Sequence, residues 1–259
     1  MLLFLKYVFL INEPGGVIIK TELKDKVALV TGASKGIGRS ISKSLASKGI
    51  NVLLAARSEE LLNSLKNEIK DSGGFAKVYP VDLRKNNDIL DLFKQIKNDF
   101  DQLDILVNNA GVIKSGNIID FSMEDFDMLV DINLRAVFSC CQQALKLMIP
   151  AKKGYIINLS SVVGIKGYPK QTAYGSVKHG IMGLTKALAA EVAEHGIKVS
   201  VILPGGVDTD LIREARPDLD SSVLMQPEDI ADTVLYLLEL PGRAMVDQIY
   251  IRRSKSTPF

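Results

Sequence analysis

Short apolar runs alternate with amphipathic stretches along most of the chain, beginning at Val27. The apolar runs are rich in β-branched residues and predict six strands, at Val27–Val30, Asn51–Ala55, Ala76–Val81, Ile105–Val107, Tyr155–Leu159 and Lys198–Leu203. Because nearly every position in these runs is apolar, we expect both faces of each strand to be buried, as a parallel sheet requires.

The stretches between these runs carry apolar residues at helical spacing. They predict helices at Gly36–Lys48, Glu59–Ser72, Asp88–Asn98, Met123–Ile149, Thr172–Glu194 and Pro227–Leu240. Ser122 and the acidic residues after it resemble a capping box, and Pro227 stands at a favourable first helical position. The regular alternation predicts an α/β fold, a doubly wound, Rossmann-like parallel sheet in a single domain with helices on both faces.

The first 20 residues precede this alternation, so we divide the chain into an N-terminal extension of unknown role, residues 1–20, and one domain, residues 21–259. The apolar segment Met1–Ile11 is shorter than the roughly 20 residues that span a bilayer. It also lacks the basic start and small-residue cleavage site of a secretion signal. We therefore predict no membrane association and a cytoplasmic location, with a native start near Val17 as an alternative.

Composition narrows the possible partners. The chain has 259 residues, of which 47% are hydrophobic, and its 32 basic residues nearly balance 30 acidic ones. No basic run is interleaved with aromatic residues, so nucleic acid is not expected as a partner. Cys140 and Cys141 are adjacent in a helical stretch and are expected to pack as small apolar groups in a reduced protein. Neither His179 nor His195 has a second ligand at metal-binding spacing, so no metal is predicted.

A glycine-rich loop follows the first predicted strand and opens the first predicted helix. In this context glycines allow backbone amides to approach a pyrophosphate at the positive end of a helix dipole. The glycines are spaced Gly-x-x-x-Gly-x-Gly, and the candidate cofactor-binding residues are Gly32, Ser34, Lys35, Gly36, Ile37 and Gly38. A turn whose glycines serve only the fold is the alternative.

Two basic side chains indicate which nucleotide the loop would bind. Arg57 ends the second predicted strand, where a cofactor with a free ribose 2′-hydroxyl would require a carboxylate. An arginine suits a 2′-phosphate instead, and Lys35 adds a second cation from the loop. We therefore predict NADP(H), against the alternative that both residues are ordinary surface charges.

Tyr174-x-x-x-Lys178 forms a candidate acid/base pair, with Ser161 thirteen residues before the tyrosine. On a helix, residues four apart share a face, which places the Lys178 ammonium beside the Tyr174 ring. The phenol has an unperturbed pKa of roughly 10, and a neighbouring cation is expected to lower it. Alone, such a pair is common on solvated helices, so its significance depends on the other motifs.

Five blocks in order resemble the short-chain dehydrogenase/reductase family over about Lys24 to Leu240. They are Thr31-Gly-Ala-Ser-Lys-Gly-Ile-Gly38, Val81-Asp-Leu83, Asn108-Asn-Ala-Gly111, Ser160-Ser161 with Tyr174-x-x-x-Lys178, and Pro204-Gly205-x-x-x-Thr209. The resemblance implies that Tyr174 is the general acid/base and that Lys178 lowers its pKa and binds the nicotinamide ribose. It further implies that Ser161 holds the substrate oxygen and that Asn133 anchors a water beside Lys178.

The same resemblance implies further cofactor contacts. Asp82 and Leu83 would lie at the adenine, Asn109, Ala110 and Gly111 at the adenosine ribose, and Val207 and Thr209 at the carboxamide and pyrophosphate. The C-terminal tail departs from the pattern of 3-oxoacyl thioester reductases, which leaves the last strand in doubt. It resembles more closely the generalist NADP-dependent reductases and hydroxy-acid dehydrogenases.

We therefore expect an NADPH-dependent carbonyl reductase that is reversible as an alcohol dehydrogenase and acts on a small carbonyl or alcohol substrate. The alternatives are a 3-oxoacyl carrier-protein reductase and a non-catalytic nucleotide-sensing protein. The expected pocket residues are Val163, Ile165, Tyr168, Gln171, Leu211, Leu224 and Met225, with Arg213 or Arg216 as a less favoured carboxylate ligand. Long helices that are apolar on more than one face predict a homodimer or homotetramer.

Overall fold

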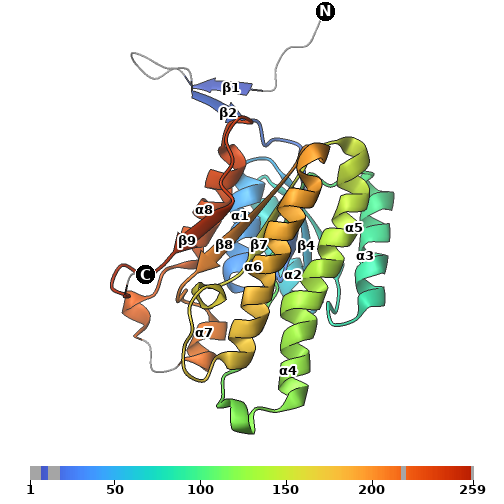
Figure 1. Ribbon diagram of the computed structural model, residues 1–259. Helices are drawn as coiled ribbons and strands as arrows, with labels where there is room; N and C mark the ends of the chain where they lie inside the picture. Colours follow the sequence, from blue (N-terminus) through green and yellow to red (C-terminus); the bar gives the residue numbers. More distant parts are fainter. Residues whose placement is uncertain (1–6, 11–17, 217–219, 258–259) are drawn as a thin grey trace, which may run out of the picture.

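A seven-stranded parallel sheet forms the centre of the molecule (Figure 1). The computed structural model describes residues 7–10, 18–216 and 220–257. The strands are β3 (Val27–Thr31), β4 (Asn51–Ala56), β5 (Phe75–Pro80), β6 (Ile105–Asn108), β7 (Gly154–Leu159), β8 (Ile197–Pro204) and β9 (Gln248–Ile251). Their order across the sheet is β5-β4-β3-β6-β7-β8-β9. The predicted doubly wound parallel sheet is confirmed.

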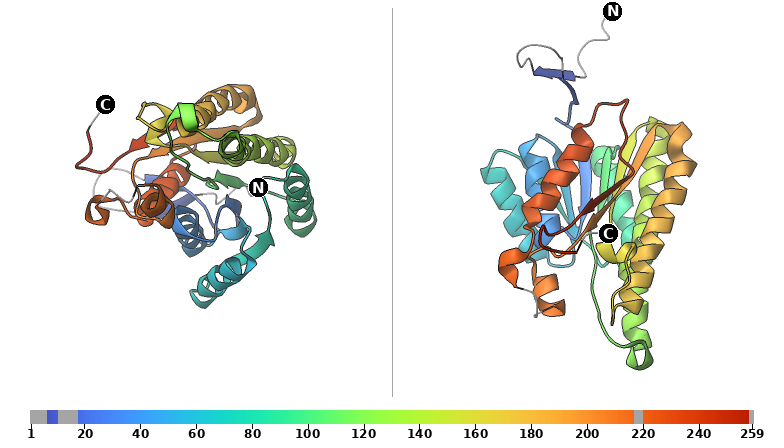
Figure 2. Two further views of the ribbon diagram at one scale, coloured as in Figure 1. Left: turned by 90° about the horizontal axis from the view of Figure 1, so that it is seen from below. Right: turned by 60° about the vertical axis from the view of Figure 1, so that its left-hand side comes forward.

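Helices cover both faces of the sheet (Figure 2, right). One layer contains α1 (Gly36–Ser47), α2 (Glu59–Asp71) and α8 (Pro227–Glu239), and the other contains α3 (Asn86–Phe100), α5 (Ala136–Ala151) and α6 (Thr172–Val192). Because side chains alternate along a strand, Ala28 and Val30 pack into the first layer, whereas Val27 and Leu29 pack into the second. This explains why the strands are apolar at successive positions.

The predicted helix Met123–Ile149 is interrupted near its middle. It consists of α4 (Met123–Val130), a π-helical turn (Asp131–Arg135) and α5. Periodicity did not reveal the turn, because it depends on Asn133, a buried polar residue of the turn whose side chain donates to neighbouring carbonyls. Of the capping box predicted here, the structure shows the serine part, since Ser122 Oγ accepts from the amides of Glu124 and Asp125.

The loops after β3, β4, β6, β7 and β8 meet at the carboxyl edge of the sheet. Strand order reverses between β3 and β6, and open α/β sheets bind ligands in the crevice at such a point. A short helix that the sequence did not predict, α7 (Asp210–Ala215), lies at this edge (Figure 1). Short helical turns occur at Ile118–Asp120, Val162–Gly164, Ala193–His195 and Ser221–Val223.

The last strand, which the sequence left in doubt, completes the sheet. Strand β9 pairs in parallel with β8, with Pro204 opposite Ile251. Beyond the strand, the Gly205 amide donates to the Ile251 carbonyl at 2.8 Å. This pairing brings the tail after Ile251 to the same edge as the loops named above.

An antiparallel hairpin of β1 (Tyr7–Leu10) and β2 (Ile18–Thr21) precedes the domain and lies at the end of the molecule remote from α7 (Figure 1). Thr21 Oγ1 donates to the Leu240 carbonyl at 2.7 Å. Residues 1–6 and 11–17 of the predicted extension lie outside the described residues. Within the described ranges, no helix has the length and apolar character needed to cross a membrane.

Candidate active site

At its glycine positions, the loop between β3 and α1 has almost no room for side chains. Gly32 and Gly36 adopt φ values of +66° and +55°, a region that favours glycine. A Cβ on Gly38 would lie 2.3 Å from the Gly32 carbonyl oxygen and 2.4 Å from Asn109 Nδ2. Lys35, the N-cap of α1, makes no side-chain cap bond, and the first turn holds no acidic residue. The bare backbone and the uncapped amides together suit a phosphate group.

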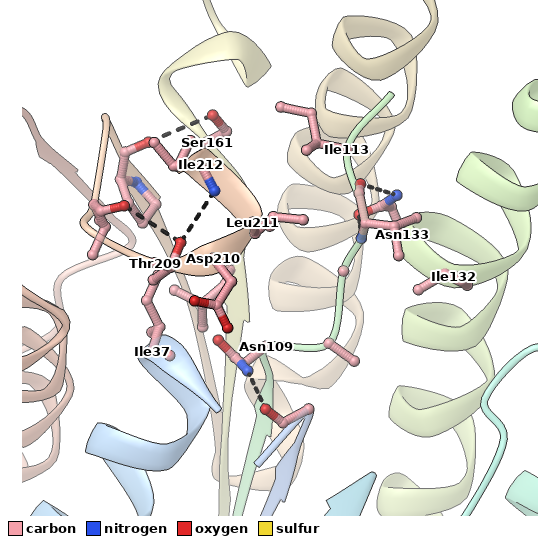
Figure 3. A pocket seen from close by; sticks show the side chains of 18 of the residues that line it. Ile37, Asn109, Ile113, Ile132, Asn133, Ser161, Thr209, Asp210, Leu211 and Ile212 are labelled. Atoms are coloured by element: carbon pink, nitrogen blue, oxygen red, sulfur yellow. Dashed lines mark hydrogen bonds between the residues drawn. The ribbon is translucent and has the colours of Figure 1, made fainter. Parts of the chain in front are cut away.

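Hydrogen bonds of Asn109 join the glycine loop to the end of β6. Its Nδ2 donates to the Gly32 carbonyl at 3.2 Å (Figure 3) and to the Thr31 carbonyl at 2.9 Å. The amides of Asn109 and Ala110 in turn donate to Thr31 Oγ1, at 3.0 and 3.1 Å. The predicted Asn-Ala-Gly block therefore lies against the glycine loop, with the Asn109 amide group holding the loop in shape.

Three basic residues, Lys35, Arg57 and Arg84, line the same cavity and form its basic rim. Arg57 and Lys35 both line it, as predicted candidates for a 2′-phosphate, and Arg84 joins them. Asp82 accepts from Arg84 Nε at 3.0 Å, and this bond, followed by the charge of Arg57, lowers the pKa of the Asp82 carboxyl. Lys35 Nζ also lies 3.6 Å from Asp210 Oδ2, and both residues line the cavity. The sequence reasoning missed Arg84, whose only signal was its position two residues after Asp82.

Tyr174 and Lys178 form the buried centre of the cavity. Both line it from α6, and Lys178 Nζ lies 5.7 Å from the Tyr174 ring centroid. Lys178 Nζ also donates to the Leu159 carbonyl at 3.0 Å. Burial lowers the pKa of Lys178 to about 8. The tyrosine and lysine are therefore adjacent, as helical spacing predicted.

The predicted direction of the Tyr174 pKa shift is wrong. Burial raises this pKa to about 12, and a hydrogen bond with Ser161 opposes the rise. The reason is that a buried phenolate loses its hydration, and this loss outweighs the stabilising hydrogen bond from Ser161. A neutral, protonated phenol near neutral pH is suited to proton donation.

The two adjacent serines have different surroundings. Ser161 caps the turn Val162–Gly164 by accepting from the Val163 amide at 3.2 Å, and its hydroxyl lies 3.5 Å from the Pro204 carbonyl (Figure 3). Ser160 is buried and donates to the Lys178 carbonyl at 3.0 Å. Ser161 thus remains beside Tyr174, whereas the hydroxyl of Ser160 braces α6.

Asn133 occupies the π-helical turn and connects it to the loop after β6. Its Nδ2 donates to the Val112 carbonyl at 3.0 Å (Figure 3). Nδ2 also donates to the Leu129 carbonyl at 3.1 Å, while Oδ1 accepts from the Val112 amide. A Cβ on Gly111 would lie 2.8 Å from Asn133 Oδ1 and 3.8 Å from Lys178 Nζ. Gly111 therefore keeps open the space between Asn133 and Lys178. The water that the family resemblance implies between Asn133 and Lys178 stays a prediction.

Comparison with known proteins identifies the family. The family model for short chain dehydrogenases matches residues 26–220. This chain belongs to the short-chain dehydrogenase/reductase family. An uncharacterized oxidoreductase of Staphylococcus epidermidis is 35% identical over 231 residues, covering 89% of this chain and 98% of the relative. One of Staphylococcus aureus is 34% identical, covering 90% and 99%.

Solved structures agree with this assignment to the short-chain dehydrogenases. A metagenomic short-chain oxidoreductase in complex with NADP has a TM-score of 0.80 and 32% identity, covering 90% of this chain and all of that one. A single-residue variant of the actinorhodin polyketide ketoreductase with NADPH has a TM-score of 0.83 and 31% identity, covering 88% and 96%. The alcohol dehydrogenase of Thermococcus sibiricus with 5-hydroxy-NADP has a TM-score of 0.85, 26% identity, and covers 91% and 100%.

The candidate site residues of this short-chain dehydrogenase surround one cavity of about 670 Å³. The predicted residues that line it are Gly32, Ser34, Lys35, Gly36, Ile37, Arg57, Asp82, Leu83, Asn109, Ala110, Gly111, Asn133, Ser161, Tyr174, Lys178, Val207 and Thr209. Gly38 is buried behind the loop. Among the described residues, no cluster of three or more histidine, cysteine or acidic side chains could hold a metal ion.

Some expected pocket residues of the short-chain dehydrogenase lie elsewhere. Val163, Tyr168, Gln171 and Leu211 line the cavity, whereas Ile165, Leu224 and Met225 do not. Leu224 is buried under Gly206, whose Cβ would lie 2.9 Å from Leu224 Cδ2, and Met225 pairs with Val207 through its backbone. Of the two arginines considered for a carboxylate, Arg216 lines the cavity, whereas Arg213 forms ion pairs with Asp208 and Asp210 at 3.0 and 3.5 Å.

Proposed function

We propose that this protein is an NADP(H)-dependent oxidoreductase that interconverts a carbonyl group and a secondary or primary alcohol. The observation that carries the proposal is the meeting of two sets of residues in one cavity. Ser161, Tyr174 and Lys178 provide a proton-transfer centre, while the bare glycine loop and its basic rim provide a place for a phosphorylated nucleotide. When bound, the cofactor supplies or accepts the hydride.

The glycine loop fits the phosphates of such a cofactor. Gly36 lines the cavity without a side chain, Gly38 lets the loop pack closely against Gly32 and Asn109, and the start of α1 has no side-chain cap over its amides. Lys35, Arg57 and Arg84 would hold the 2′-phosphate, and Asp82 and Leu83 the adenine. Asn109, Ala110 and Gly111 would border the adenosine ribose, and Val207 and Thr209 the carboxamide and pyrophosphate. All three solved relatives named above contain NADP, NADPH or a derivative.

In the direction of reduction, Tyr174 gives its proton to the substrate oxygen, and Ser161 donates a hydrogen bond that stabilises the charge developing there. Lys178, when protonated, stabilises the phenolate that remains, and it would also hold the nicotinamide ribose of a bound cofactor. Asn133 holds the water through which Lys178 exchanges protons with solvent. In the reverse direction Tyr174 is the base.

The proposed function is tested by following NADPH oxidation at 340 nm with ketones, aldehydes, 3-oxo acids and 3-oxoacyl thioesters, each repeated with NADH. Turnover that favours NADPH supports the proposal. A 3-oxoacyl thioester reductase is the second candidate, favoured by the likeness to a polyketide ketoreductase. Failure to reduce acetoacetyl thioesters, under conditions where simple ketones react, would exclude it.

Arg57 gives a sharper test of the cofactor assignment. Arg57→Gln removes a charge-assisted hydrogen bond to the 2′-phosphate, so kcat/KM for NADPH should fall about 10- to 100-fold while that for NADH stays unchanged. The matched control is Lys66→Gln, because Lys66 is an exposed cation on α2 that does not line the cavity. An equal loss with both cofactors would contradict the role given to Arg57.

The pH dependence of reduction should report Lys178. Its pKa is lowered to about 8, so its ammonium is present below pH 8 and is lost as pH rises through that value. Tyr174, with a pKa near 12, keeps its proton over the same range. We expect kcat/KM for reduction to decline above about pH 8, because the charge that stabilises the phenolate disappears. A profile from pH 6 to 10 at saturating NADPH checks this, and a flat profile would refute it.

We further infer that the chain acts as a homodimer or homotetramer in the cytoplasm, with residues 21–259 as one domain. Phe138 on α5 is 59% exposed, which supports burial of this helix against a second subunit. The buried free thiols of Cys140 and Cys141 suit a reducing compartment. Sedimentation equilibrium that gives the mass of one chain would refute the oligomer.

A further inference from the structure

A second cavity of about 640 Å³ adjoins the candidate reaction centre. Its walls come from the loop after Ser161, the turn after β8 and the tail after β9. Five residues line both cavities, namely Val162, Tyr168, Gly205, Gly206 and Arg253. A substrate whose reacting carbonyl lies at Ser161 and Tyr174 can therefore extend into the second cavity.

The second cavity is strongly basic. The charged residues that line it are Lys166, Arg252, Arg253 and Lys255, and no acidic residue is among the described residues of its wall. The first cavity, in contrast, includes Asp82, Asp210 and Glu214. A concave surface with one sign of charge concentrates ions of the opposite sign. The second cavity is therefore suited to an anionic group.

The two arginines of the tail have different contacts. Arg252 Nη1 donates to the carbonyls of Arg253 and Ser256 at 3.0 and 2.6 Å and thereby shapes the tail into a turn. The Arg253 side chain lies over Gly206, where a Cβ would be 3.5 Å from its Cδ and Nε. None of the ion pairs formed among the described residues involves Arg253. Arg253 lines both cavities, and its side chain forms no ion pair with a carboxylate of the described residues.

The position of Arg253 is fixed by the sheet. The Gly205 amide donates to the Ile251 carbonyl at 2.8 Å, and a Cβ on Gly205 would lie 3.3 Å from Arg252 Cα. The tail thus crosses closely over the bare Gly205–Gly206 backbone. A half-buried arginine held in this way presents a planar fork of donors, which matches the two oxygens of a carboxylate or phosphate.

We propose that Arg253 binds an oxyanion on the substrate, a carboxylate or a phosphate, and so selects acidic substrates over neutral ones. The inference rests on the proposed function, because it names the substrate class of the same site. Arg253 is a specificity residue that contacts a part of the substrate away from the reacting carbon. Its loss should affect the anionic member of a pair of otherwise similar substrates.

The test compares matched substrate pairs with and without an oxyanion. One pair is 4-oxopentanoate and its methyl ester, and the other is acetoacetyl-coenzyme A and acetoacetyl-N-acetylcysteamine, which lacks the phosphates. With Arg253→Gln, kcat/KM for the anionic member should fall about 10- to 100-fold, while the neutral member changes less than about twofold. Arg253→Lys, which keeps the charge but loses the fork, should give an intermediate value. A loss confined to the 4-oxopentanoate pair would identify a carboxylate as the group that Arg253 binds, and a loss confined to the acetoacetyl-coenzyme A pair would identify a phosphate.

Arg243→Gln is the matched control, because Arg243 is an exposed arginine that precedes the amino end of β9, whereas Arg253 follows its carboxyl end, and Arg243 lines neither cavity. This substitution removes the same positive charge and should leave kcat/KM unchanged for both members of each substrate pair. Equal losses for both members, or no loss for the anionic one, would overturn the inference, as would wild-type turnover of neutral members alone. Absence of turnover of every ketone and thioester by the wild type would instead refute the proposed function and this inference with it.

Discussion

Tyr174→Phe should lose turnover by about 10²- to 10⁴-fold while it still binds NADPH. The substitution removes only the phenolic oxygen, and the ring can remain buried in the apolar cluster that it shares with Val163 and Val177. Without the hydroxyl, the proposed proton donor beside Ser161 is lost. Single-turnover rates and NADPH fluorescence titration measure the two quantities separately.

Tyr236→Phe is the control for this experiment, because Tyr236 is 54% exposed on α8 and does not line the cavity. It should retain the wild-type rate. Unchanged turnover in Tyr174→Phe would remove the proposed mechanism. Loss of NADPH binding together with turnover would also count against it, since the effect would then be structural. Normal binding with lost turnover would exclude a protein that only senses the nucleotide.

Gly38→Ala should weaken NADPH binding by at least about tenfold and destabilise the protein by about 1–3 kcal/mol, the usual cost of overpacking. The new Cβ would lie 2.3 Å from the Gly32 carbonyl and 2.4 Å from Asn109 Nδ2. Neither atom can move freely, because the carbonyl belongs to the loop backbone and Asn109 is hydrogen-bonded to Thr31. The glycine loop must therefore change shape. Isothermal titration with NADPH and thermal unfolding check the two effects.

Gly183→Ala provides the matched control. Gly183 lies in α6, and a Cβ there would have no atom within 4 Å. Since alanine is favoured over glycine inside a helix, this variant should gain up to about 1 kcal/mol of stability and bind NADPH normally. Equal behaviour of the two variants would show that the close contact at Gly38 has no consequence.

The sequence predicted those features whose signals are local. Strands such as Val27–Thr31 are apolar at successive positions because both faces of the sheet are covered, and this pattern is visible without a structure. The glycine loop was equally recognisable, since Gly32 and Gly36 take a backbone conformation that other residues avoid. The spacing of Tyr174 and Lys178 follows from helix geometry alone.

Features that depend on distant contacts were missed or wrongly predicted. The π-helical turn depends on the bond between Asn133 and Val112, and β9 depends on pairing with β8. Leu224 was expected in the pocket because it follows the right strand, but its side chain is buried under Gly206. The pKa of Tyr174 was predicted from one neighbour, whereas the depth of burial decides its direction.

The residues proposed to transfer protons and the residue proposed to select the substrate lie in different parts of the chain. All of the proposed proton-transfer residues lie within residues 26–220, the stretch that the family model matches, whereas Arg253 lies beyond it. The sheet nevertheless returns this tail to the mouth of the cavity through the pairing of Ile251 with Pro204. If Arg253 selects the substrate as proposed, we expect exchange of residues 248–257 among relatives to change substrate preference while the reaction chemistry stays the same. For the same reason, an affinity tag would be placed at the other end of the chain.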